Sequence, residues 1–77
     1  MNVKIYTTPT CPWCIKTKEF LKQHNIKYTE IDVSASPEAA HEMIHKSGQM
    51  AVPVIDIDGK IIVGYDVERI KKALKLE

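Results

Sequence analysis

A chain of 77 residues is enough for one domain, so we treat residues 1–77 as a single folding unit. Its 11 basic and 10 acidic side chains give a formal charge of +1, which provides no electrostatic footprint for nucleic acid or for an anionic membrane surface. The first residues, MNVKIYTTP, lack the apolar run of a secretory signal, and no stretch reaches the ~20 apolar residues of a membrane span. We therefore expect a monomeric cytoplasmic protein with no nucleic-acid partner and no membrane partner, in a compartment where stable structural disulfides are rare.

The first half of the chain predicts a strand, a helix and a second strand. Residues 3–7, VKIYT, are β-branched or aromatic and are bounded by Pro9, which favours a strand. A helix is predicted from Pro12 to residue 24, with Asn25 as a plausible stop. One face of this helix carries Thr17, Phe20, Leu21 and His24. Residues 26–33, IKYTEIDV, alternate less cleanly and are interpreted as the second strand.

The second half predicts a helix, a β-hairpin and a last helix. Ser36 suits the N-cap of the first of these helices, and Gly48 suits its end. Two apolar runs flank Asp58 and Gly59, a pair that supplies the positive φ angles of a tight hairpin turn. Asp66 is placed to cap the last helix. The apolar face of that helix consists of Val67, Ile70, Ala73 and Leu74.

The resulting order of strands and helices is βαβαββα. A strand–helix–strand unit connects parallel strands by a right-handed crossover, so the first two strands should be parallel. The hairpin then extends the same sheet in the antiparallel sense, and helices cover the faces of the sheet around one core. The sequence thus predicts an α/β fold with a central four-stranded mixed sheet flanked by three helices.

Both cysteines of the chain lie in the segment TCPWC, residues 10–14, where the first strand leads into the first helix. Three residues apart in a first helical turn, Cys11 and Cys14 can form a disulfide with little backbone movement. Cys11 faces the free N–H groups and the positive end of the helix dipole, which favour a thiolate, whereas Cys14 turns back into the helix. We therefore expect Cys11 to attack a disulfide and Cys14 to resolve the mixed disulfide.

Three other interpretations of the cysteine pair remain open at this point. A structural staple would close a very small loop, and the stabilisation from loop closure falls with loop length. A zinc site could combine Cys11 and Cys14 with His41 and His45, although a predicted strand lies between the two pairs. Inert buried thiols are the third interpretation. The histidines are more simply explained as exposed residues of the second helix, whose better core candidates are Ala40, Met43 and Ile44.

The segments IYTTPTCPWC, AVPVI and GYD, in this order, resemble the glutaredoxin family of the thioredoxin fold, and the resemblance runs over residues 3–74. It implies a thioredoxin-like fold and a thiol–disulfide oxidoreductase or electron carrier with a redox-active disulfide and no bound cofactor. It also implies a cis bond between Val52 and Pro53 that faces the cysteines, with Val52 offering backbone hydrogen bonds to a substrate. The expected catalytic residues are Cys11 and Cys14, and the expected substrate-binding residues are Thr10, Pro12, Trp13, Val52, Pro53, Gly64, Tyr65 and Asp66. Trp13 is expected to be exposed rather than in the core. Gly64 and Asp66 match part of a family segment whose helix N-terminus receives the γ-glutamyl carboxylate of glutathione, and Asp66 either belongs to this site or only caps the helix.

The sequence departs from the family where glutathione is usually bound. Members that use glutathione usually carry a cation at the position of Thr8. They often carry another just before the segment that contains the cis proline, where this chain has Gln-Met-Ala at residues 49–51. Val63 and Val67 stand where the family has a glycine and an aspartate. Each missing charge-assisted contact would weaken binding by ~1.5–3 kcal/mol. We therefore expect a flavoprotein thiol reductase as electron donor, and protein disulfides such as those of ribonucleotide reductase or a peroxiredoxin as substrates. The alternatives are a glutathione-dependent glutaredoxin that acts on glutathione mixed disulfides, and a binding module that holds zinc or an iron–sulfur cluster through Cys11.

Overall fold

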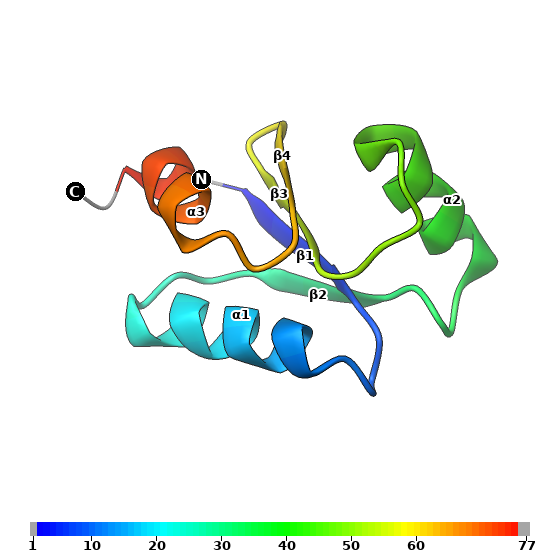
Figure 1. Ribbon diagram of the computed structural model, residues 1–77, viewed down its shortest axis with the longest axis horizontal. Helices are drawn as coiled ribbons and strands as arrows, with labels where there is room; N and C mark the ends of the chain where they lie inside the picture. Colours follow the sequence, from blue (N-terminus) through cyan, green and yellow to red (C-terminus); the bar gives the residue numbers. More distant parts are fainter. Residues whose placement is uncertain (1, 76–77) are drawn as a thin grey trace.

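The computed structural model describes residues 2–75, in which seven elements follow one another in the predicted order. They are β1 (Val3–Thr7), α1 (Pro12–Gln23), β2 (Thr29–Asp32), α2 (Pro37–Ser47), β3 (Val54–Ile57), β4 (Lys60–Val63) and α3 (Val67–Leu74). Within this part of the chain the strands form one sheet in the order β2-β1-β3-β4, with β1 parallel to β2 and antiparallel to β3 (Figure 1). The predicted mixed sheet is therefore confirmed. None of the helices in these residues is long and apolar enough to cross a membrane.

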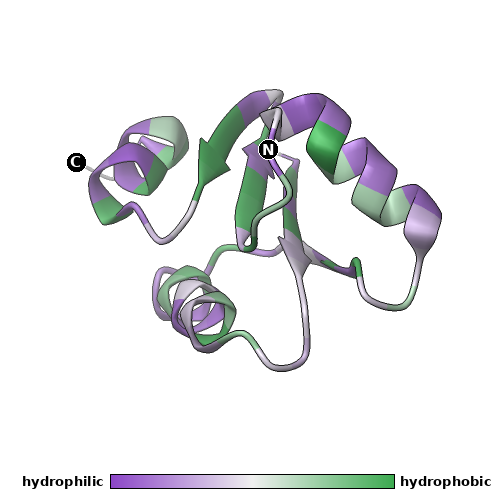
Figure 2. Ribbon diagram, turned by 45° about the vertical axis from the view of Figure 1, so that its right-hand side comes forward, coloured by the Kyte–Doolittle hydropathy of each residue, from purple (hydrophilic) through white to green (hydrophobic). Residues whose placement is uncertain are grey.

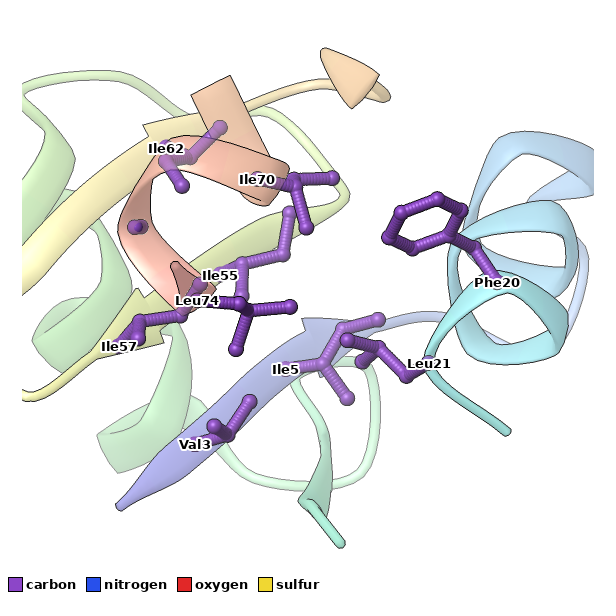
Figure 3. Packing of buried hydrophobic residues seen from close by; sticks show 10 residues of the cluster. Val3, Ile5, Phe20, Leu21, Ile55, Ile57, Ile62, Ile70 and Leu74 are labelled. Atoms are coloured by element: carbon purple, nitrogen blue, oxygen red, sulfur yellow. The ribbon is translucent and has the colours of Figure 1, made fainter. Parts of the chain in front are cut away.

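Side chains of β1 alternate between the two faces of the sheet, so the strand contributes to two separate cores. Val3 and Ile5 point to the face covered by α1 and α3, whereas Tyr6 points to the face covered by α2. On the first face, Phe20 of α1 and Ile70 of α3 point toward each other over the strands (Figure 3). The buried residues of this larger core are Val3, Ile5, Phe20, Leu21, Ile55, Ile57, Ile62, Ile70, Ala73 and Leu74. Apolar residues accordingly concentrate in the central strands, while the helices carry both apolar and polar residues (Figure 2).

The helix ends and the hairpin turn lie at the residues that the sequence predicts. Ser36 caps α2 by accepting a backbone hydrogen bond at 3.2 Å, and Gly48 ends that helix with a φ of +73°. Asp66 caps α3 in the same manner, again at 3.2 Å. Asp58 and Gly59 have φ angles of 51° and 91°, as the predicted two-residue hairpin turn requires.

The second strand is shorter than predicted, because only residues 29–32 form β2. The prediction is wrong for residues 26–28 and for residue 33. In the parallel register, Lys4 of β1 pairs with Thr29 of β2. Since β1 begins at Val3, only one of its residues precedes Lys4, and almost no strand remains opposite residues 26–28. The apolar side chains of residues 26–28 pack against the larger core instead. After β2, the Asp32 carboxylate accepts hydrogen bonds from the backbone N–H and the hydroxyl of Ser34, at 2.9 and 2.6 Å, and the chain turns.

The helix α1 ends one residue earlier than predicted. His24, which the pattern placed on the apolar face, is the exposed C-cap, and its ring centroid lies 4.5 Å from that of Phe20. Asn25 follows with a φ of 57°, which is outside the helical region. The predicted stop at Asn25 is therefore confirmed.

A partly buried polar network lies on the α2 face of the sheet. The Lys46 ammonium donates hydrogen bonds to the Tyr6 hydroxyl at 2.9 Å and to the Asp56 carboxylate at 2.7 Å. Its bonds to Asp56 and Tyr6 raise the pKa of Lys46. Burial by itself would raise the pKa of Asp56, but the hydrogen bonds that Asp56 accepts from Lys46 and Gly59 outweigh burial and lower it. The network connects α2 to β1 and β3, which holds this helix on the sheet.

Candidate active site

Cys11 is the N-cap of α1 and joins the loop after β1 to the helix. Its Sγ atom accepts a hydrogen bond from the backbone N–H of Cys14 at 3.1 Å. This N–H group and the positive end of the helix dipole favour a negative charge on the sulfur. Pro12 takes the first helical position, where its missing N–H removes no helical hydrogen bond. Cys11 is 9% exposed and therefore largely buried, although it is more accessible than Cys14, which is 1% exposed.

Cys14 is 1% exposed and lies in the first turn of α1. The pKa of its thiol is raised to about 12, chiefly by burial and then by the hydrogen bond with Cys11, while the positive charge of Lys18 opposes this shift. The Lys18 ammonium is held by the carboxylate of Glu30 at 2.8 Å. Both cysteines are free thiols. They differ in exposure and in the hydrogen bonds and charges around the sulfur.

The peptide bond between Val52 and Pro53 is cis, as the resemblance implies. The carbonyl oxygen of Val52 lies 3.9 Å from the Cys11 Sγ atom, which donates its thiol hydrogen toward it. The backbone N–H of Gly64 donates a hydrogen bond to the Pro53 carbonyl at 2.8 Å, which connects this loop to the end of β4. The loop between α2 and β3 thus brings its backbone to the Cys11 sulfur, although Val52 and Cys11 are 41 positions apart.

Trp13 projects from α1 and is 54% exposed, so the prediction of an exposed tryptophan is confirmed. Its ring stacks on Tyr65, with the ring centroids 5.9 Å apart and the planes at 30°. The Lys16 ammonium lies 4.8 Å from the centroid of the Trp13 ring. A groove of about 270 Å³ is lined by Trp13, Val52, Pro53, Gly64 and Tyr65. We call it the tryptophan groove, and it lies next to Cys11 because Val52 lines the groove and its carbonyl oxygen faces the Cys11 sulfur.

Gly64 and Asp66 lie at the start of α3, on either side of Tyr65. Gly64 has a φ of +85°, a conformation that glycine adopts without steric cost. The Asp66 carboxylate accepts a hydrogen bond from the Arg69 backbone N–H at 3.2 Å, and its second oxygen lies 3.5 Å from the Arg69 Nε atom. Asp66 is therefore the helix cap, and any ligand that it binds must share the carboxylate with this cap.

Thr10 and Pro12 are exposed on either side of Cys11. Two lysines outside the predicted set of site residues lie close to members of that set. Lys16 follows Trp13 by three residues and Lys18 follows Cys14 by four, the two spacings that bring side chains together on a helix. This helical spacing is the signal that could have identified both lysines.

The zinc interpretation required His41 and His45 beside the cysteines. Both histidines are exposed on α2, which covers the sheet face away from α1. Among residues 2–75, no three His, Cys, Asp or Glu side chains come together as a possible metal site. The described part of the chain therefore offers no closed four-ligand zinc site around the cysteine pair.

Comparison with known sequences matches the chain to the glutaredoxin family over residues 3–62. The chain is 49% identical over 73 residues to an uncharacterized glutaredoxin-like 8.6 kDa protein in the rubredoxin operon of Clostridium pasteurianum, covering 95% of this chain and 97% of that protein. It is 38% identical over 65 residues to glutaredoxin 3 of Escherichia coli K12, covering 84% of this chain and 78% of that protein. The predicted family is therefore confirmed.

Solved structures agree with this match. The T8A mutant of the thioredoxin-like protein BC3987 superposes with a TM-score of 0.92 at 32% identity, covering 99% of this chain and 97% of that one. The glutaredoxin-like protein NrdH-redoxin of Escherichia coli, described as having a thioredoxin-like activity profile, superposes with a TM-score of 0.83 at 26% identity, covering 94% and 93%. The fold is thus thioredoxin-like, as predicted.

Proposed function

The chain belongs to the glutaredoxin family, and we propose that it is a small redoxin that reduces protein disulfides with Cys11 and Cys14. The environment of the Cys11 sulfur carries this proposal. The sulfur lies at a helix N-terminus, accepts the Cys14 N–H at 3.1 Å and lies 3.9 Å from the Val52 carbonyl oxygen. The Cys14 N–H, which stabilises a thiolate, and the Val52 backbone, along which a substrate can align, thus both lie at the same sulfur.

In the first step, the Cys11 thiolate attacks one sulfur of a substrate disulfide. A bond forms between Cys11 and that sulfur while the substrate S–S bond breaks. The other substrate sulfur leaves as a thiolate and takes up a proton. The tryptophan groove lies beside the reacting sulfur, so Trp13 and Val52 can hold the substrate segment in place.

In the second step, Cys14 loses its proton and attacks the Cys11 sulfur. The Cys11–Cys14 disulfide forms, the mixed disulfide breaks, and the second substrate sulfur leaves and is protonated. Two electrons have then passed from the dithiol to the substrate. Because the pKa of Cys14 is raised by burial, this thiol does not compete with Cys11 for the substrate in the first step.

We propose that a flavoprotein thiol reductase of the thioredoxin-reductase type returns the protein to its dithiol form. Thr8 and Met50 are uncharged at positions where members that use glutathione usually carry a cation. A glutathione carboxylate would therefore lack a charge-assisted hydrogen bond there, which contributes about 1.5–3 kcal/mol to binding. The thioredoxin-like activity profile stated for NrdH-redoxin supports this electron donor. Protein disulfides such as those of ribonucleotide reductase or a peroxiredoxin are the proposed substrates.

A glutathione-dependent glutaredoxin is the second candidate, and one contact favours it. The Lys16 ammonium, 4.8 Å from the centroid of the Trp13 ring, places a cation at the rim of the tryptophan groove. The identity with glutaredoxin 3 of Escherichia coli supports the same candidate.

The electron donor is tested by reducing the oxidised protein in two parallel assays. One assay contains NADPH and a thioredoxin reductase, and the other contains NADPH, glutathione and glutathione reductase. The proposal expects faster reduction in the first assay. Faster reduction by glutathione would instead establish the second candidate.

The roles of the two cysteines are tested by the variant Cys14→Ser. It should form a covalent adduct with a protein disulfide substrate through Cys11 and fail to release the substrate, because the resolving thiol is missing. Mass spectrometry of the adduct identifies the cysteine involved. Multiple turnovers by this variant without added thiol would show that Cys14 is not the resolving residue.

A further inference from the structure

A second groove lies on the α2 side of Val52. It has a volume of about 140 Å³ and is lined by Thr8, Val33, Met43, Met50, Ala51 and Val52. We call it the methionine groove. Val52 lines this groove and the tryptophan groove, so the two meet at the residue whose carbonyl oxygen faces Cys11.

The lining of the methionine groove is uncharged and largely apolar. Met50, at its rim, is 79% exposed. A methionine side chain is unbranched and polarizable, so it adapts to apolar partners of different shape. Among residues 2–75, the large apolar side chains that are exposed are Trp13, Ile15 and Met50. Two of these three therefore lie at the grooves that flank Val52.

Two backbone contacts place the methionine groove next to the nucleophile. The Thr8 carbonyl accepts a hydrogen bond from the Cys11 N–H at 3.4 Å, and the Val52 carbonyl oxygen lies 3.9 Å from the Cys11 Sγ atom. An extended substrate chain advances ~3.3 Å per residue and directs successive side chains to opposite sides. A substrate cysteine that meets Cys11 therefore brings a side chain one or two residues away over the methionine groove.

We propose that the methionine groove binds an apolar side chain of the substrate protein, one or two residues from the cysteine that Cys11 attacks. The inference rests on the proposed function and specifies its substrate class, which is disulfides in extended segments with an apolar neighbour. An acidic neighbour is disfavoured, because its carboxylate would lose water at an uncharged lining without gaining a counterion. Partial burial of a leucine in this open groove corresponds to about a tenfold preference for leucine over aspartate.

The test uses short peptides closed by one disulfide, with leucine, asparagine or aspartate at the positions one and two residues from each cysteine. The reduced full-length protein is mixed with each peptide, and the second-order rate of peptide reduction is measured by the fluorescence of Trp13. We expect the leucine peptides to react about tenfold faster than the aspartate peptides at one of these positions, with asparagine between them.

The variant Met50→Lys changes the groove without disturbing the core, because the Met50 side chain is exposed. We expect it to lower the leucine rate and to raise the aspartate rate, so that the preference falls several-fold or inverts. Met50→Leu should keep the preference. Ile15→Lys is the matched control, because it places the same charge on another exposed apolar residue that lines neither groove. It should change both rates alike.

A small neutral disulfide, bis(2-hydroxyethyl) disulfide, distinguishes failure of the groove proposal from failure of the proposed function, because it has no side chain for the groove to bind. If the wild-type protein reduces this compound and all peptides at similar rates, the groove proposal is overturned and the proposed function stands. If it reduces neither the neutral compound nor any peptide, the proposed function is overturned with it. If Met50→Lys converts a dimer into a monomer in sedimentation experiments, a second copy of this chain covers the groove and the proposal is overturned.

Discussion

Resolution of the mixed disulfide by Cys14 should depend steeply on pH. The pKa of the Cys14 thiol is raised to about 12 from an ordinary value of 9.0, mainly by burial. In the free dithiol at pH 7.5 the thiolate fraction is then roughly 1 in 30,000, against roughly 1 in 30 for the ordinary thiol. When Cys11 is bonded to a substrate, its own contribution ends, but the larger contribution of burial remains and keeps Cys14 protonated at neutral pH. Since the thiolate is the attacking species, the resolution rate should rise close to tenfold for each pH unit, and about a hundredfold between pH 6.5 and pH 8.5.

Both steps can be followed in one experiment with 2,2′-dithiodipyridine. Attack by Cys11 releases one thiopyridone, and attack by Cys14 on the mixed disulfide releases a second, so absorbance shows two phases. The slope of the second phase against pH gives the titration of Cys14, and Cys14→Ser identifies that phase by removing it. A second phase that levels off below pH 9 would show that Cys14 titrates as an ordinary thiol, and the argument from burial would be wrong.

Three further variants test other parts of the structure. Lys18→Met should slow the second phase a few-fold and move its titration to higher pH, because the charge that lowers the pKa of Cys14 is removed. Lys46→Met should lower the free energy of unfolding in urea by about 2 kcal/mol, because the fully buried Tyr6 loses its hydrogen-bond donor. Thr8→Lys should raise turnover with glutathione several-fold, because it adds a cation near Cys11 for a glutathione carboxylate.

Each of these variants has a control, which is a second variant for the two lysines and a second assay for Thr8→Lys. Lys22→Met removes a charge from an exposed position of α1 and should leave the pH dependence of the second phase unchanged. Lys72→Met does the same on α3 and should change stability by less than about 0.5 kcal/mol. Turnover with a flavoprotein reductase serves as the internal reference for Thr8→Lys. Equal effects of a variant and its control, or unchanged glutathione turnover in Thr8→Lys, would contradict the corresponding argument.

The sequence by itself determined the features whose signals lie within a few residues. Ser36, Gly48 and Asp66 mark helix ends because capping depends on one side chain and the adjacent turn. The Asp58-Gly59 turn follows from the φ angles that such a pair tolerates. Cys11 could be placed at a helix start for the same reason, since Pro12 begins the helix directly after it.

Only the tertiary structure decided the features that depend on distant segments. The length of β2 is set by where β1 begins, so the alternating pattern of residues 26–28 could not reveal that these residues pack without pairing. The contact between Val52 and Cys11 joins positions 41 apart, and the methionine groove combines side chains from four separate segments of the chain. The burial that raises the pKa of Cys14 likewise arises only when α1 packs on the sheet, because local sequence sets backbone geometry while desolvation requires the assembled core.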